Sequence, residues 1–218
     1  MDLYEAMRCA PTTRGFTDEP VSPAALLRAL EAARFAPSGG NRQGWRVIAV
    51  QDPELRRKLG ELYLPHWRAY LHRLGMDTVL EDPDADPVLR RRIGGADLYA
   101  RALPEVPLHL VVGVCLDDLA VTDAALPRTS IVGGASIYPF VQNLLLALRA
   151  EGLGAAMTTL LVPAEAAVRQ LLGIPDDVIL AAHVGVGHRA EEWPRRLSRR
   201  PVSEFAFADR WGEPLQAL

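Results

Sequence analysis

Two long apolar runs constrain the fold of this chain more than any other feature of its sequence. Leu108–Leu116 and Val178–Val186 are almost continuously apolar, which predicts strands that are buried on both faces of a sheet. The segment Ser136–Ala150 is apolar on nearly all sides and predicts a central helix. Because helices and strands alternate along the chain, we expect a mixed α and β fold with one sheet between helices.

Weaker patterns predict the remaining elements. Ser22 is expected to cap a helix that has Pro23 at its first position, and Gly152 is placed to end the central helix. Further helices are expected over residues 1–7, about 53–64 and 163–172, and further strands over 45–50 and 155–160. Pro65 should kink or break the helix before it.

Two segments differ from this pattern. Residues 72–104 are rich in Asp, Arg, Pro and Gly, which predicts a mobile, partly helical insertion, and we expect residues 65–105 to form a lid. The tail Trp193–Leu218 carries Arg and Pro with little apolar content. It should be extended and should need another surface to lie against.

Composition bounds the class of protein. The 218 residues are 49% apolar and 23% charged, with a net charge of −3, so a single ordered domain is expected and nothing favours nucleic acid or an anionic membrane. Cys9 and Cys115 make neither a disulfide framework nor zinc-ligand spacing. The first ten residues lack a basic start followed by an apolar run. We therefore expect a soluble, cytoplasmic protein without a metal site.

The side chains offer no obvious covalent catalyst. The chain has no GxSxG, GxxxxGK[ST], HExxH or post-strand GxGxxG motif. Its five histidines show no ligand-like spacing and are expected to be structural or exposed, and Cys115 lies inside an apolar strand, where a thiol is inert. These absences favour chemistry carried by a bound cofactor.

Three polar segments have the groups that would hold a flat, anionic cofactor. Arginine matches phosphate oxygens, glycine lets the backbone approach a ligand, and Asn and Gln suit the edge of a heterocycle. The segments are Arg8 with Thr12-Thr13-Arg14, Pro37-Ser38-Gly39-Gly40-Asn41-Arg42-Gln43, and Arg195-Arg196-Leu197-Ser198-Arg199-Arg200. Taken alone, such segments are more often a solvated turn, an ordinary loop and a solvated face, respectively, and only their order along one chain is more specific.

Taken in order, these segments resemble the nitroreductase family of FMN-dependent oxidoreductases. Thr12–Phe16 is similar to the family's N-terminal phosphate motif, and Ala36–Trp45 to its APSxxNxQPW loop. Gly152–Leu160 resembles the segment that leads to the flavin ring. Leu172–Pro175 with Val184–His188, and Arg199-Arg200-Pro201, complete the resemblance.

The resemblance implies an α+β fold, a three-layer α-β-α sandwich, in an intertwined homodimer that exchanges terminal segments and holds FMN at its interface. The first group of implied FMN contacts holds the phosphate or lies beside the flavin ring. Its members are Arg8, Thr12, Thr13, Arg14, Thr158, Thr159, Leu160, Arg199 and Arg200. The second group is Pro37, Ser38, Gly39, Asn41 and Gln43, of which Ser38 and Asn41 would come from the neighbouring subunit.

The sequence departs from the family pattern at the phosphate motif. Ala10 and Pro11 stand where the family usually has Arg, and Arg8 is a candidate replacement. Losing one charge-assisted phosphate contact would weaken FMN binding by about ten- to a hundredfold. Thr158-Thr159 also stands where some members carry Glu-Gly, which implies a different substrate.

The implied activity passes a hydride from NADH or NADPH through flavin N5 to a nitroaromatic, quinone or similar small aromatic acceptor, by a ping-pong mechanism. Arg42 is a candidate for stabilising charge on the ring, although an exposed loop Arg is an equal alternative. Trp67, Tyr70 and Tyr99 could supply the substrate walls or could simply pack. Two other functions remain open: an FMN storage protein without turnover, and a specialised enzyme such as a deiodinase or a flavin-cleaving enzyme.

Overall fold

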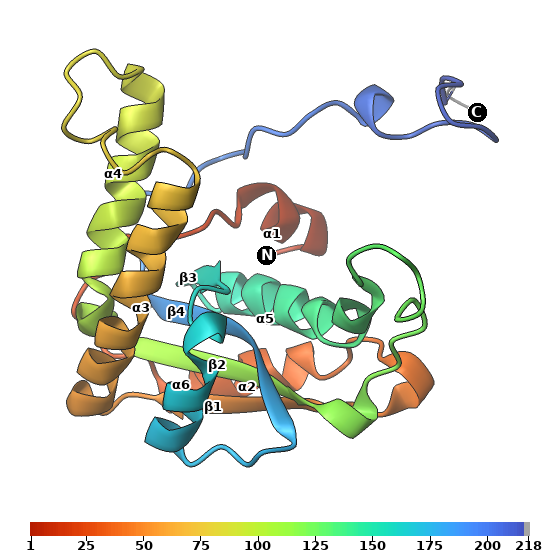
Figure 1. The fold of residues 1–218 in the computed structure, drawn as a ribbon, viewed down its shortest axis with the longest axis horizontal. Coiled ribbons are helices and arrows are strands. Elements are labelled where there is room, and N and C mark those ends of the chain that lie inside the picture. Colours follow the sequence, from red (N-terminus) through yellow and green to blue (C-terminus); the bar gives the residue numbers. More distant parts are fainter. Residues whose placement is uncertain (216–218) are drawn as a thin grey trace.

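A four-stranded antiparallel sheet forms the centre of the protein (Figure 1). The computed structural model describes residues 1–215. The strands are β1 (Trp45–Val50), β2 (Leu108–Cys115), β3 (Leu153–Thr158) and β4 (Val178–His188), in the order β1-β2-β4-β3. The helices are α1 (Leu3–Cys9), α2 (Pro23–Ala33), α3 (Pro53–Arg73), α4 (Pro87–Arg101), α5 (Tyr138–Ala150) and α6 (Glu165–Leu172). The expected α+β class is confirmed, and the two apolar runs are the two central strands.

Helices cover both faces of the sheet. Side chains alternate along a strand, so Leu108, Leu110 and Val112 of β2 enter one core with α2 and α5, whereas Val111 enters a second core with α3 and α4. These two cores give three layers. In Figure 1, α3 and α4 stand side by side and project beyond the sheet.

The segment after α1 docks onto the edge of the sheet. Thr12 bridges Ala155 of β3, and the Thr13 amide donates to the Ala155 carbonyl at 2.9 Å. This docking needs missing side chains on the sheet, because a Cβ at Gly154 would lie 2.7 Å from the Thr13 side chain. In the same way, a Cβ at Gly185 would lie 2.5 Å from the Tyr99 hydroxyl. These glycines let neighbouring segments pack directly on strand backbone.

Several boundaries differ from the sequence prediction. The helix that we expected to end near residue 64 continues through Pro65 to Arg73 as α3, and β3 ends at Thr158 rather than at residue 160. Pro65 is exposed, so the carbonyl that its ring leaves without a donor can be hydrated. The insertion 72–104 is partly helical, as predicted, because it contains the 15-residue helix α4.

The predicted helix ends are mostly confirmed. Gly152 follows α5 with a φ of +80°, and Gly173 ends α6 with a φ of +67°, which suits glycine in both places. Pro23 is the first residue of α2, but the Ser22 side chain makes no capping hydrogen bond. Between Trp193 and residue 215 the tail leads away from the sheet, extended apart from short turns such as Val202–Glu204 (Figure 1). The last three residues of the predicted tail lie outside the described part of the chain. Within residues 1–215, none of the helices has the length and apolarity that a membrane crossing requires.

Candidate functional site

An aromatic cavity of about 290 Å³ lies between the end of β3 and the helices α3 and α4. It brings together candidate residues from three distant parts of the sequence: the N-terminal loop, the end of β3 and the predicted insertion. Its lining residues are Thr12, Arg14, Tyr63, Trp67, Tyr70, Ala96, Tyr99, Ala156, Met157, Thr158, Thr159 and Leu160. Five implied FMN contacts and all three suggested aromatic substrate residues therefore share one cavity.

The N-terminal loop gives this cavity an unpaired cation. Arg14 is exposed, and its side chain makes no hydrogen bond or ion pair with any residue in the described part of the chain. Thr13, next to it, is fully buried, and its hydroxyl also lacks a partner among residues 1–215. Because the edge of the sheet fixes this loop, the Arg14 guanidinium is held at the mouth of the cavity and is free to bind an anion.

The end of β3 forms the floor of the cavity. The Thr158 hydroxyl oxygen accepts from the Leu160 amide at 3.2 Å and lies 3.4 Å from the Tyr63 hydroxyl. Burial is the largest effect on Tyr63 and raises the pKa of its hydroxyl, so the group is a neutral donor at physiological pH. Thr159 is exposed and also lines the cavity.

The aromatic walls come from α3 and α4. The Trp67 indole donates to Asp97 Oδ1 at 2.9 Å, and Arg101 Nε donates to Asp97 Oδ2 at 2.7 Å. Burial alone would raise the Asp97 pKa, but the bonds from Trp67 and Arg101 outweigh burial and lower it, so the carboxylate is ionised. Tyr99 is buried with a hydroxyl that has no partner in the described chain, and burial raises its pKa. Trp67 and Tyr70 lie with ring centroids 6.1 Å apart.

A pair of buried histidines lies beneath this floor. His183 is opposite Thr158 in the sheet register, and its ring is 6.4 Å from that of Tyr63. His183 Nε2 and His109 Nδ1 are 3.0 Å apart, and His109 Nε2 is 2.9 Å from the Leu103 carbonyl oxygen. Burial lowers the pKa of both imidazoles, that of His109 to about 4. Both are neutral core residues at pH 7.

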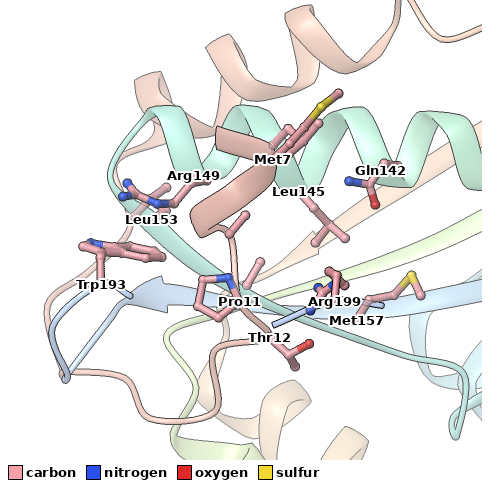
Figure 2. A pocket seen from close by; sticks show the side chains of 13 residues that line it. Met7, Pro11, Thr12, Gln142, Leu145, Arg149, Leu153, Met157, Trp193 and Arg199 are labelled. Carbon is pink, nitrogen blue, oxygen red and sulfur yellow. The ribbon is translucent and has the colours of Figure 1, made fainter. Parts of the chain in front are cut away.

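A second cavity, of about 250 Å³, adjoins the first because Thr12 and Met157 line both (Figure 2). It lies between α1, α5, β3 and the tail. Figure 2 shows Arg149 beside Trp193 at one end and Arg199 beside Met157 at the other. The Arg149 guanidinium lies 3.8 Å from the centre of the Trp193 ring. Among the lining residues there is no carboxylate, so this cavity suits an anionic group.

The tail arginines gather beside this second cavity. Arg8, Arg199 and Arg200 line an open groove between α1 and the tail, and Arg199 also lines the second cavity. The Leu197 amide donates to the Arg8 carbonyl at 2.8 Å, which holds the tail against α1. The structure thus places the third polar segment next to the first.

The implied FMN contacts in loop 37–43 do not lie at either of these cavities. It follows α2 and contains a 3-10 turn, Gly39–Asn41, and it lines neither cavity. The Gly39 amide donates to the Ser136 hydroxyl oxygen at 3.0 Å, and the Gln43 amide donates to Ser38 Oγ at 3.0 Å. Asn41 and Gln43 both have a φ of +54°, which is strained for residues other than glycine and is often found at functional loops.

Within one chain, therefore, Pro37, Ser38, Gly39, Asn41, Arg42 and Gln43 do not share a cavity with Arg14. The Arg42 guanidinium donates to the Asp117 carbonyl at 3.1 Å, so it is bound to a backbone group of the same chain outside the aromatic cavity. The sequence analysis missed Tyr63 and Asp97. The spacing of Tyr63, Trp67 and Tyr70 by four and three residues would have placed them on one helix face, had the helix not been ended at residue 64.

Comparison with known proteins gives consistent matches. The family model described as "Nitroreductase family" matches residues 11–188. A 5,6-dimethylbenzimidazole synthase from Rhodobacter capsulatus is 29% identical over 212 residues, which cover 89% of this chain and 95% of that protein. An NADH dehydrogenase from Thermus thermophilus is 30% identical over 198 residues, covering 88% and 89%. A crystal structure of iodotyrosine deiodinase bound to FMN and 3-iodo-L-tyrosine shares the fold with a TM-score of 0.70 at 22% identity, covering 95% and 100%.

Proposed function

The chain belongs to the nitroreductase family, as its motifs predicted, and from this premise we propose that it is an FMN-dependent NAD(P)H oxidoreductase for small aromatic acceptors. The observation that carries the proposal is the shared aromatic cavity. An unpaired arginine, the end of β3 and the aromatic residues Trp67, Tyr70 and Tyr99 surround one space. The relatives named NADH dehydrogenase and the FMN-bound deiodinase support both the electron donor and the cofactor.

The residues present fit FMN. Its phosphate needs cations and hydroxyl donors, which Arg14, Thr12 and Arg199 supply around the two adjoining cavities. Its ring needs a flat polar floor with backbone donors nearby, which residues 158–160 supply. The two cavities, of about 290 and 250 Å³, together have the size of a typical cofactor pocket.

When bound, FMN would supply the redox chemistry, taking a hydride from NADH or NADPH and passing it to an electron-poor aromatic compound. The chain would supply placement. Arg14 and Thr12 would hold the phosphate, and the backbone of Thr158–Leu160 would lie along the ring. Trp67 and Tyr70 would stack on the acceptor and exclude water from the cavity. Donor and acceptor would occupy this cavity in turn, which predicts ping-pong kinetics.

The second copy of the chain has a defined part in this proposal. The tail projects from the body with Trp211 91% exposed and Phe205 64% exposed, and an isolated chain has no surface to cover them. Loop 37–43 has the strained backbone of a binding loop but lies away from its own chain's cavities. We propose that two copies exchange tails and that Ser38 and Asn41 of each copy reach the other's FMN. A monomer in sedimentation equilibrium would contradict this arrangement.

Binding and turnover are tested separately. The purified protein should show flavin absorbance, and anaerobic NADH or NADPH should bleach it. Arg14→Ala should weaken FMN binding at least about tenfold in a fluorescence titration, the loss of one charge-assisted contact. Arg92→Ala, at an exposed arginine on α4, is the matched control and should leave the affinity unchanged.

Each alternative function has its own result. A yellow protein that is never bleached would favour FMN storage. The relative named 5,6-dimethylbenzimidazole synthase favours a specialised enzyme as the second candidate. If that enzyme is the flavin-cleaving one, FMN itself should be lost in the presence of oxygen and NAD(P)H. A colourless protein that binds no added FMN would overturn the proposal, and unchanged affinity in Arg14→Ala would overturn the phosphate assignment.

A further inference from the structure

Trp67 belongs both to the second core and to the wall of the aromatic cavity. Its side chain is only 6% exposed, so it belongs to the second core, yet it also lines the aromatic cavity. A small rotation of its ring would therefore change the shape of the cavity directly. A buried indole N–H needs a hydrogen-bond partner, so the position of that partner helps to set the orientation of the ring and the shape of the cavity.

A buried carboxylate from the neighbouring helix fixes this ring. Asp97 Oδ1 accepts from the Trp67 indole N–H at 2.9 Å, across 30 residues of sequence. Asp97 is 9% exposed, and burying a carboxylate between helices is costly where an apolar side chain would pack as well. A hydrogen bond to a charged acceptor is roughly twice as strong as a neutral one and is directional. The hydrogen bond to Trp67 thus offsets part of the cost of burying Asp97, and it also orients the indole ring.

Arg101 has a separate part in this cluster. Its Nε donates to Asp97 Oδ2 at 2.7 Å, one helical turn away on α4, while its side chain is largely exposed. Arg101 compensates the charge of Asp97 from the solvent side and is not among the residues that line the cavity. The two carboxylate oxygens therefore have different partners: Oδ1 accepts from Trp67 in the cavity wall, and Oδ2 accepts from Arg101 on the solvent side.

We propose that Asp97 is a positioning residue that holds the Trp67 ring as a wall of the aromatic cavity and thereby sets the selectivity for flat aromatic acceptors. The effect on substrate selectivity rests on the proposed function. The effect on the orientation of the Trp67 ring rests only on the Trp67–Asp97 hydrogen bond. The test of the proposal has a part that does not require turnover.

The structural part uses the indole N–H signals in ¹H–¹⁵N spectra of the full-length protein. Trp67→Phe identifies the Trp67 signal by its loss. In the wild type this N–H should exchange slowly with solvent. In Asp97→Asn, which keeps the size of the side chain, its exchange should accelerate by about tenfold or more, because the charged acceptor is lost. Unchanged exchange in Asp97→Asn would overturn the proposal whether or not the protein is an enzyme.

The kinetic part separates positioning from general stability. Asp97→Asn should raise KM for a flat nitroaromatic by about tenfold with FMN affinity unchanged, as expected for the loss of one oriented contact. In a Trp67→Phe background, Asp97→Asn should have almost no further effect on KM. An equal effect in both backgrounds would show that Asp97 acts only on stability and would refute the proposal. Arg92→Gln, at an exposed arginine on the same helix that makes no bond to Asp97, is the matched control, and its KM should stay near that of the wild type.

Discussion

The buried histidine pair predicts an unusual loss of stability on mild acidification. His109 Nε2 faces the Leu103 carbonyl, which can only accept, so this nitrogen carries the proton. His109 Nδ1 is then an acceptor, and His183 Nε2–H donates to it. His183 Nδ1 is left without a partner in the described chain. Both rings are consequently neutral in the native state, and neither can gain a proton without leaving a buried charge.

The magnitude follows from the difference between the folded and unfolded pKa values. Burial holds the His109 pKa at about 4, against 6.5 in an unfolded chain, and that of His183 well below 6.5. Between these values the unfolded state binds protons that the native state cannot, so stability present at pH 7 is lost as the pH falls. From pH 7 to pH 5 His109 alone should cost about 2 kcal/mol of unfolding free energy. His183, whose pKa burial also lowers, adds to this loss in the same direction.

Urea unfolding at pH 7, 6 and 5, at one protein concentration, measures this loss. In His109→Gln the contribution of that group is gone, so the loss between pH 7 and pH 5 should be smaller than in the wild type by about 2 kcal/mol. Gln170→Asn, at an exposed position on α6 and without a titratable group, is the control and should keep the wild-type slope. The reasoning is refuted if the wild type loses under about 1 kcal/mol over this range, or if His109→Gln retains the full slope.

Two further contacts give separate predictions, both read from urea midpoints. Gly185→Ala places a methyl group 2.5 Å from the Tyr99 hydroxyl and should cost about 2 kcal/mol. Tyr99→Phe removes that unpartnered hydroxyl, should itself stabilise by about 1 kcal/mol, and should make Gly185→Ala tolerable. Asp123→Ala removes a carboxylate that accepts from Arg128, Ser130 and the Ile131 amide. This change should cost about 2 kcal/mol of unfolding free energy and make the loop easier to cleave with a protease. An Asp123→Ala variant as resistant to proteolysis as the wild type would contradict this prediction.

The sequence predicted the centre of the fold because continuous apolar runs in the sequence indicate buried strands and helices. The runs that became β2 and β4 are apolar on both faces, and the helix that became α5 is apolar around most of its surface. The neighbours of these strands in the sheet could not be predicted, because β2 and β4 are separated by α5, β3 and α6. Pairing over such distances depends on the whole chain's packing rather than on any local pattern.

Local rules failed where tertiary contacts overrode them. Proline disfavours a helix interior, yet α3 passes through Pro65 because Tyr63, Trp67 and Leu71 on either side of it are buried against the second core. The composition around α4 indicates a solvated insertion, yet Asp97 within it is buried by its bonds to Trp67 and Arg101. A sequence gives no sign that an aspartate on one helix has an indole as its partner on another. The motifs therefore provide a hypothesis about the chemistry of the site, whereas its geometry could only come from the structure.

The distribution of buried polar side chains connects the two halves of the candidate site. In the part of the chain that the structure describes, six such residues are buried: Thr13, Asp97, His109, Asp123, Ser136 and His183. Four lie around or beneath the aromatic cavity. Ser136 accepts from the Gly39 amide, and Asp123 organises the loop that leads to Ser136, so these two support loop 37–43.

Buried polar groups are costly, and proteins concentrate such departures from ideal packing at functional sites. The core beneath α2 and α5 is apolar, whereas the polar burial is divided between the aromatic cavity and a loop that the same chain cannot bring to it. One site completed by two copies accounts for both concentrations, because each copy would then support its own cavity and its partner's missing wall. A dimer structure in which loop 37–43 lies far from both aromatic cavities would break this connection and leave the polar support beneath that loop unexplained.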